Sequence, residues 1–224
     1  MLKIEHVSKS YDKEIFKDFN LNIETDKITC ILGGSGVGKT TLLKMIAGLT
    51  AYSGNIRRPS RLSYIFQEDR LIPSLTVEDN LKLVNPEATI EEINKVLATL
   101  ELVGMEKRYP KSLSGGEAKR VAMARAFLYD GKVILMDEAF SSLDLALKIK
   151  LINYFADLWQ AKKRTVIFVT HEIDEALLLA HNIYILRDGI IASKYQINSN
   201  YPRSLDANLD LRKKIVSDIL NDKL

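Results

Sequence analysis

Residues Gly33 to Thr40 have the spacing G-x-x-x-x-G-K-T, which is the pattern of a phosphate-binding P-loop. Glycines in such a loop allow backbone N–H groups to turn inward and surround phosphate oxygens, where a Cβ atom would obstruct them. Lys39 places a positive charge at the β- and γ-phosphates of a nucleotide, and the hydroxyl of Thr40 is a ligand for Mg²⁺. The pattern therefore predicts a nucleotide site made of Gly33, Gly34, Ser35, Gly36, Val37, Gly38, Lys39, Thr40 and Thr41.

The segments around this loop match what it requires, a strand before it and a helix after it. Residues 27–32 form a short apolar run rich in β-branched residues, as in buried parallel strands. Residues 41–47 have a helical pattern that ends at Gly48, and this helix is expected to begin at about Gly38. Its positive N-terminal end adds to the anion site. The flanks therefore favour a phosphate site over an ordinary glycine-rich turn.

Acidic and histidine side chains stand where two other strands are expected to end. Asp137 ends the apolar run 133–137 and Glu138 follows it, while His171 follows the apolar run 165–170. In a P-loop protein the first acid holds Mg²⁺ and the second polarises the attacking water; the alternative is a pair of solvated loop carboxylates. Because the carboxyl ends of parallel strands meet at one sheet edge, His171 is expected near the γ-phosphate.

Two further residues are candidates because of their positions. Gln67 directly follows a strand-like segment, 61–66, and a place beyond a strand end favours a ligand role over that of a plain loop residue. Tyr11 lies in a turn-like segment, 8–12. It either covers a sheet edge or stacks on a nucleotide base, and the residues alone leave both interpretations open.

A second glycine-rich segment opens a predicted helix. Ser114 and Glu117 form an S-x-x-E capping box, which by itself only starts a helix. Gly115 and Gly116 are adjacent in the first turn, where glycine is unfavourable. Both glycines are understandable if the backbone approaches a ligand such as a phosphate closely.

Composition limits the classes of function. The chain has 224 residues, of which 46% are hydrophobic, and a net charge of +3 from 32 basic and 29 acidic residues. This near balance argues against a dominant nucleic-acid surface. Its one cysteine, Cys30, argues against a disulfide framework or a zinc site. No signal-peptide core and no run of about 18 apolar residues is present, so a cytoplasmic chain is expected, and another subunit must supply any membrane part.

The order of the elements predicts an α/β fold with a mainly parallel sheet. Residues 1 to about 25 have the pattern of an antiparallel β element, and residues 183–192 that of a hairpin with a turn at Asp188–Gly189. We predict one domain over 1–224, in which a core and β subdomain occupy about 1–70 and 130–224 and inserted helices form a subdomain over about 71–129.

The P-loop, the signature Leu113–Glu117 and the acid-ended run 133–137, in this order, resemble the ATP-binding cassette (ABC) ATPases over nearly the whole chain. The resemblance implies a P-loop NTPase core of the RecA type that binds ATP and Mg²⁺. It implies catalytic roles for Glu138, His171, Gln67 and Lys39, Mg²⁺ binding by Thr40, Gln67 and Asp137, base stacking by Tyr11, and contacts of Ser114, Gly115, Gly116 and Glu117 with ATP.

Two positions depart from this family's pattern. Glu117 stands where the signature usually ends in glutamine, and Ala139 stands where proline commonly follows the catalytic glutamate. Neither change removes a phosphate ligand, but an added carboxylate near ATP can alter affinity. Ser142, Leu143 and Asp144 lie where the family communicates between two subunits.

The resemblance also implies partners. In this family each ATP lies between the P-loop of one chain and the signature helix of another, in a head-to-tail dimer. A homodimer, or a pair with a second ABC ATPase, is therefore expected, together with integral membrane permease subunits and, indirectly, a solute-binding protein. The chain is expected at the inner face of the cell membrane through the permease, and no nucleic-acid partner is expected.

Residues 67–80 resemble the same stretch in bacterial importer ATPases for nitrate, sulfonate and taurine-type substrates. Leu71, Ile72 and Leu75 either form a groove for a permease helix or pack the helical subdomain. The predicted function is the ATP-hydrolysing motor of an importer, whose cargo this chain does not encode. The alternatives are an exporter or lipoprotein-release ATPase, and a soluble ABC ATPase that acts on nucleic acid.

Overall fold

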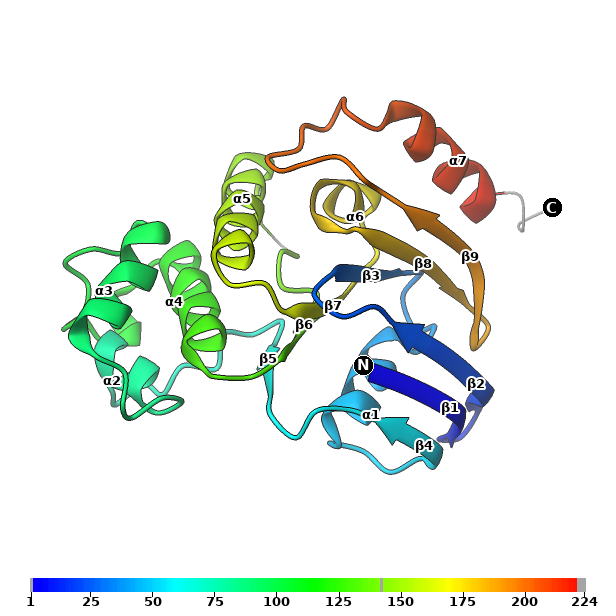
Figure 1. Cartoon of the computed structure of the whole chain (residues 1–224), viewed down its shortest axis with the longest axis horizontal. Helices are drawn as coiled ribbons and strands as arrows, with labels where there is room; N and C mark the ends of the chain where they lie inside the picture. Colours follow the sequence, from blue (N-terminus) through cyan, green and yellow to red (C-terminus); the bar gives the residue numbers. More distant parts are fainter. Residues whose placement is uncertain (1, 142, 221–224) are drawn as a thin grey trace. The chain divides into compact units, whose positions relative to one another are not determined.

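The computed structural model describes residues 2–141 and 143–220. The chain forms two compact units, one made of Met1–Ser60 with Arg164–Leu224 and the other of Arg61–Lys163. Figure 1 labels the helices and strands of both units along the chain. The second unit contains the helices of the segment 71–129 and also β5, β6 and α5, which are described below.

The first unit contains a three-stranded antiparallel sheet of β1 (Leu2–Ser10), β2 (Glu14–Ile23) and β4 (Ser53–Arg57), in the order β2-β1-β4 (Figure 1). Leu2 and Ile4 are buried with a more exposed Lys3 between them, because successive side chains of a strand point to opposite faces. Val7 is buried three residues further on, because the register of β1 with β2 shifts between Ile4 and Val7. The antiparallel element predicted over residues 1 to about 25 is therefore confirmed.

The first unit also contains β3 (Ile28–Leu32), β7 (Thr165–Thr170), β8 (Asn182–Arg187) and β9 (Ile190–Gln196). β3 pairs in parallel with both β7 and β8, and every residue of β3 and β7 is buried, as is typical of parallel strands covered on both faces. β8 and β9 form the predicted hairpin, with Asp188 and Gly189 both at positive φ in its turn.

Three helices accompany these strands, α1 (Lys39–Ala47), α6 (Ile173–Leu179) and α7 (Leu209–Leu220). α1 follows β3 through the glycine-rich loop, as predicted. α7 is joined to the hairpin through Asp218, whose carboxylate accepts hydrogen bonds from Ser193 and Tyr195.

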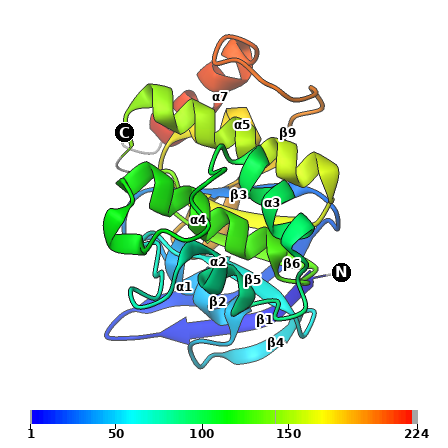
Figure 2. The same cartoon turned by 90° about the vertical axis from the view of Figure 1, so that its left-hand side faces the viewer.

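The second unit combines a parallel strand pair with helices. The strands are β5 (Leu62–Ile65) and β6 (Val133–Asp137), and the helices are α2 (Val77–Lys82), α3 (Ile90–Thr99), α4 (Gly115–Leu128), α5 (Leu145–Ala161) and the short 3₁₀ turn η1 (Pro110–Ser112). α3, α4 and α5 contact one another and are seen together in Figure 2. Their shared core includes Ile93, Leu97, Leu151 and the edge-on ring pair Phe127–Phe155.

Side-chain caps fix where these helices begin. Thr76 accepts a hydrogen bond from the backbone N–H of Asp79 at the start of α2, and Thr89 with Glu92 forms a complete capping box at the start of α3. Such caps satisfy N–H groups that have no partner within the helix. These caps mark where α2 and α3 begin.

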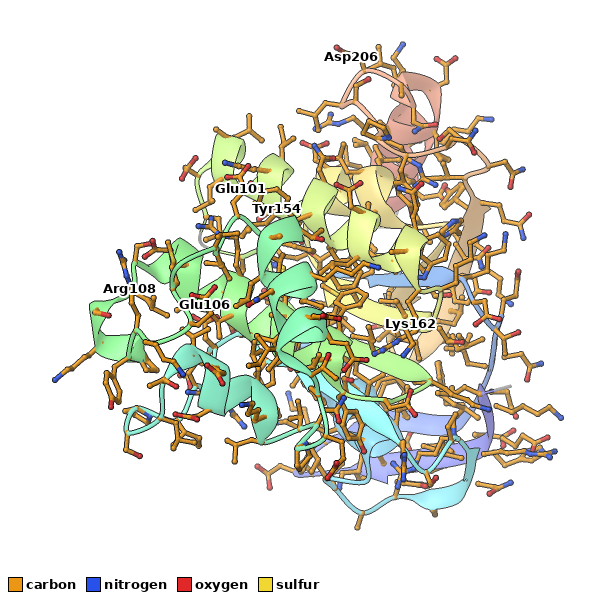
Figure 3. All side chains as sticks on the ribbon, turned by 60° about the vertical axis from the view of Figure 1, so that its left-hand side comes forward. Glu101, Glu106, Arg108, Tyr154, Lys162 and Asp206 are labelled. Carbon is orange, nitrogen blue, oxygen red and sulfur yellow. The ribbon has the colours of Figure 1, made fainter. Side chains whose placement is uncertain are left out.

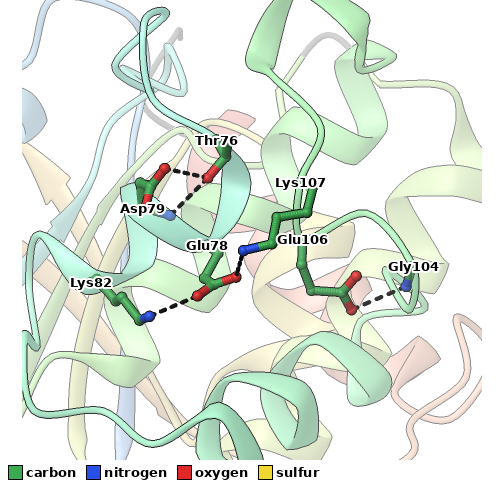
Figure 4. Close-up of polar contacts among 7 residues, drawn as sticks. All are labelled: Thr76, Glu78, Asp79, Lys82, Gly104, Glu106 and Lys107. Carbon is green, nitrogen blue, oxygen red and sulfur yellow. Dashed lines mark hydrogen bonds and ion pairs between the residues drawn. The ribbon is translucent and has the colours of Figure 1, made fainter.

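The start of α2 is tied to residues 104–108, which precede the signature segment. Glu78 forms ion pairs with Lys82 and Lys107, both at 2.6 Å, and Figure 4 shows these contacts beside the Thr76 cap. The backbone N–H groups of Val77 and Glu78 donate to the carbonyl oxygens of Arg108 and Glu106. The two segments are thus held together by backbone and side-chain bonds at the same point.

Candidate nucleotide-binding site

The glycine-rich loop of the first unit runs from the end of β3 to α1. Gly38, the residue before α1, has a φ of 101°, and a Cβ atom there would lie 2.6 Å from Cγ2 of Ile15. Only glycine fits this backbone and this space. No side chain caps the start of α1, as is typical of a helix N-terminus that binds an anion.

Lys39 is buried and its side chain turns back over the loop. Its ammonium group donates hydrogen bonds to the carbonyl oxygens of Gly33 and Gly34, at 2.9 and 2.8 Å. The positive charge is therefore held inside the curve of the loop, next to the N-terminus of α1. This is the position from which a lysine neutralises phosphate groups.

His171 lies close to the start of this loop in the fold. β3 and β7 are parallel neighbours in which Leu32 pairs with Thr170, and the N–H of Gly33 donates to the carbonyl oxygen of Thr170. The hydroxyl of Thr170 donates to Glu175 and accepts from the N–H of Glu172, which fixes the turn that carries His171. The strand ends of the P-loop and of His171 thus meet at one edge, as the sequence predicts.

Tyr11 lies in the tight turn between β1 and β2 and is 56% exposed. Lys9 lies over one face of its ring, with the ammonium 4.4 Å from the ring centre. A hydrogen bond with Thr50 lowers the pKa of the Tyr11 hydroxyl. The ring is accessible and oriented by its hydroxyl, which makes it a candidate surface for base stacking.

In the second unit, the ends of β5 and β6 bring the other candidates together. Asp137 ends β6 and is buried, and its Oδ2 accepts a hydrogen bond of 3.0 Å from the hydroxyl of Tyr64. Glu138 follows at a left-handed φ of 45°, and its carbonyl oxygen accepts from both the N–H and the hydroxyl of Ser141. The side-chain amide of Gln67 donates to the hydroxyl of Ser141 at 3.4 Å.

The backbone beyond Gln67 is held by cations of α4. Lys119 is buried, donates to the carbonyl oxygen of Gln67 at 2.6 Å and forms an ion pair of 2.9 Å with Asp69. Arg125 donates to the carbonyl oxygens of Asp69 and Arg70. The Gln67 segment and the helix that begins at the signature are therefore bonded to each other.

The signature segment forms the predicted capping box. The hydroxyl of Ser114 accepts from the N–H of Glu117, and the Glu117 carboxylate accepts from the N–H of Ser114, which lowers the pKa of that carboxyl. A Cβ atom on Gly115 would meet nothing within 4 Å. Neither packing nor dihedral angle requires glycine at this position, so its small size suits close approach by a group from outside the chain.

Several of these contacts were not predicted from the sequence. Tyr64, Lys119 and Ser141 are not in any motif of the sequence. Asp144 accepts from the N–H of Leu147 and so caps α5, while the neighbouring Ser142 lies outside the described residues.

The family resemblance implies Mg²⁺ binding by Thr40 of the first unit and by Gln67 and Asp137 of the second. Each of these side chains carries a hard oxygen of the kind that Mg²⁺ prefers. Among residues 2–141 and 143–220 no group of three or more His, Cys, Asp or Glu side chains forms a metal cage.

Residues 16–141 match the ABC transporter family over more than half of the chain. The chain belongs to this family. It is 38% identical to the aliphatic sulfonates import ATP-binding protein SsuB of Bacillus licheniformis, over 93% of this chain and 88% of that protein. It is 35% identical to SsuB 1 of Paracoccus denitrificans, over 95% of this chain and 91% of that protein.

Solved structures agree with this assignment. The dimeric structure of a bacterial ABC transporter cassette is similar with a TM-score of 0.76 and 27% identity, over 89% of this chain and all of that one. A post-hydrolysis structure of the same cassette bound to ADP and phosphate has a TM-score of 0.75 at 27% identity. The predicted P-loop NTPase fold is therefore confirmed.

The ABC ATPase is thus an ATP-binding and ATP-hydrolysing motor subunit of the importer type. Across residues 2–141 and 143–220, no helix has the length and apolar character needed to cross a membrane.

Proposed function

We propose that two copies of this chain enclose ATP and Mg²⁺ and drive a separate membrane permease that imports a small organic anion, with aliphatic sulfonates as the first class to test. The substrate class comes from the SsuB relatives, which are named for aliphatic sulfonate import. A motor subunit does not have to contact the transported solute. In this proposal the chain therefore contributes to transport only through ATP binding and hydrolysis at its nucleotide site.

The observation that carries the proposal is a pair of helix starts suited to phosphate. α1 begins after Gly38 without a side-chain cap and beside the buried ammonium of Lys39. α4 begins at Ser114 with Gly115 open to the outside. The start of α1 binds the phosphates of the ATP held by its own chain. The start of α4 contacts the γ-phosphate of the ATP held by the partner chain. Binding of ATP then favours the closed dimer, because it interacts with both chains only in that state.

Each candidate residue has a defined part in this proposal. Mg²⁺, held by Thr40, Gln67 and Asp137, would neutralise charge on the β- and γ-phosphates. The Glu138 carboxylate accepts a proton from the attacking water as its oxygen bonds to the γ-phosphorus, while the bond from the γ-phosphorus to the β–γ bridging oxygen breaks and ADP leaves with that oxygen. His171 donates a hydrogen bond to the γ-phosphate, and Tyr11 stacks on the adenine ring.

The segment after Gln67 is the proposed contact with the permease. Asn80 is fully buried and bonds to backbone groups of Ile72, Leu75 and Thr76, so the loop 71–76 has a fixed shape. Ile72 is 42% exposed on this loop. A rigid loop that presents an apolar side chain suits docking of a helix from a permease subunit, and the bonds from α4 to Gln67 give such a contact a route to the signature helix.

The proposal is tested with Glu138→Gln, which removes the base and keeps the shape. Losing a general base lowers the rate by roughly 10²–10⁴-fold, and the variant should accumulate as an ATP-bound dimer in gel filtration with Mg-ATP. Glu87→Gln, which neutralises an exposed carboxylate, is the control. A Glu138→Gln variant that still hydrolyses ATP and remains monomeric would show that Glu138 is not the base.

A further inference from the structure

Tyr64 of β5 is a half-buried polar side chain next to the proposed metal ligand Asp137. β5 and β6 are parallel neighbours in which Tyr64 pairs with Leu135, two residues before Asp137. The Tyr64 hydroxyl reaches past the end of this pairing and donates to Oδ2 of Asp137 at 3.0 Å. No motif of the sequence includes Tyr64.

The ring of Tyr64 is also held by a ring stack, and not only by this hydrogen bond. It stacks on Phe66 with ring centres 4.1 Å apart and planes 17° apart, and the Arg70 guanidinium lies 3.8 Å from the centre of the Phe66 ring. This stack sets the position of the ring, and the ring sets the position of the hydroxyl. A hydroxyl on so constrained a ring has a fixed direction.

In this pair the Tyr64 hydroxyl is the donor and the Asp137 carboxylate is the acceptor. A donor to a charged acceptor makes a stronger bond than one between neutral groups, and it limits rotation of the carboxylate about its Cβ–Cγ bond.

We propose that Tyr64 is a positioning residue for Asp137, which sets the direction of the Asp137 carboxylate toward Mg²⁺ and thereby the Mg²⁺ affinity of the nucleotide complex. The inference rests on the proposed metal role of Asp137. Partners that orient a metal ligand commonly change metal affinity by about 10–100-fold when they are removed.

The plainer role, a core tyrosine whose hydroxyl merely needs a partner, predicts a different result. In that case removing the hydroxyl changes the stability of the fold and leaves the Mg²⁺ dependence as it was. One variant, Tyr64→Phe, therefore distinguishes the positioning role from the purely structural role, because it keeps the ring stack and loses only the hydroxyl.

The test measures binding of a fluorescent ATP analogue and its dependence on Mg²⁺ concentration, together with the signal of Mn²⁺ bound in place of Mg²⁺ by electron paramagnetic resonance. Tyr64→Phe should raise the half-saturating concentration of both metals by about tenfold, with hydrolysis near the wild-type rate once Mg²⁺ is saturating. Tyr64→Met, which also lacks the hydroxyl, should shift it by the same factor, so the result does not depend on one variant folding.

Tyr154→Phe is the matched control. Tyr154 lies on α5 beside Lys150 and near Glu101, and both Tyr154 and Glu101 are labelled in Figure 3. Its metal dependence should be that of the wild type. An unchanged metal dependence in Tyr64→Phe, with a clear loss in Asp137→Asn, would overturn the role of Tyr64 alone. An unchanged dependence in Asp137→Asn as well would overturn the metal role of Asp137 and the inference with it.

Discussion

Replacing Gly38 with alanine tests whether the loop geometry, and not only its glycine content, makes the nucleotide site. Gly38 has a φ of 101°, and the added Cβ would lie 2.6 Å from Cγ2 of Ile15 and 3.0 Å from Cζ of Phe16. Left-handed backbone costs a residue with a Cβ about 1–2 kcal/mol. Crowding a packed site adds about 1–3 kcal/mol. The lower entropy of the unfolded alanine chain offsets about 0.4–1 kcal/mol.

Gly36→Ala is the internal comparison for Gly38→Ala. Gly36 also has a positive φ, 80°, but a Cβ atom there would meet nothing within 4 Å. Only the backbone effect applies, so we expect Gly36→Ala to destabilise by about 1 kcal/mol and Gly38→Ala by about 2–4 kcal/mol.

Urea unfolding followed by circular dichroism measures both stabilities, and binding of a fluorescent ATP analogue reports the site. Gly38→Ala should also lose most of its ATP affinity, because displacement of Ile15 and the loop moves the N–H groups that hold phosphate. Equal losses of stability in the two variants, or a Gly38→Ala protein as stable as wild type, would refute the steric argument.

Three further changes test the second unit. Lys119→Met leaves the partly buried Asp69 without its cation and should lower stability by about 1–3 kcal/mol, as measured by thermal unfolding. It should also reduce ATPase activity, as measured by phosphate release. A loss of stability below the error of the melting curve would contradict the proposal that Lys119 holds the Gln67 segment in place. Glu78→Gln should cost about 0.5–1 kcal/mol at neutral pH. Lys107 and Lys82 lower the pKa of Glu78 below its ordinary value of 4.5. The difference in unfolding free energy between wild type and Glu78→Gln should therefore reach its maximum above pH 4.5 and disappear as the pH falls through the lower pKa of the folded state. A difference that does not change with pH would show that the ion pairs contribute nothing. Ser114→Ala removes the cap of α4 and should cost about 1 kcal/mol, with a larger loss of ATPase activity than of stability; activity that falls only in step with unfolding would assign Ser114 a structural role alone.

Much of the fold was predictable because its signals are local. The G-x-x-x-x-G-K-T spacing, the apolar run 27–32 and the capping box at 114–117 each act within a few residues, and each is followed or formed by the expected element, α1, β3 and α4 respectively. The antiparallel strands near the N-terminus were equally readable from alternation. In these segments neighbouring residues dictate the conformation.

The contacts that join segments were not predictable in the same way. The bond from Tyr64 to Asp137 connects residues 73 positions apart, and that from Lys119 to Gln67 spans 52. Such pairs depend on strand order and helix packing, which a single sequence does not reveal. Asn80 gave a partial signal, since an amide at a buried helical position must find partners, but the sequence does not say that they are backbone groups of the loop before it.

The central claim is that each ATP is handled by the P-loop of one chain and the signature of another. The most direct test mixes two inactive variants, Lys39→Ala, which loses the P-loop charge, and Gly115→Asp, which places a carboxylate where the partner's γ-phosphate is proposed to bind. Each variant alone should lack ATPase activity. Co-expressed and purified together, their mixed dimers contain one intact composite site, so activity should return, up to about a quarter of wild type for random pairing in a two-fold dimer. Activity no higher than that of the separate variants would contradict a site shared between two chains.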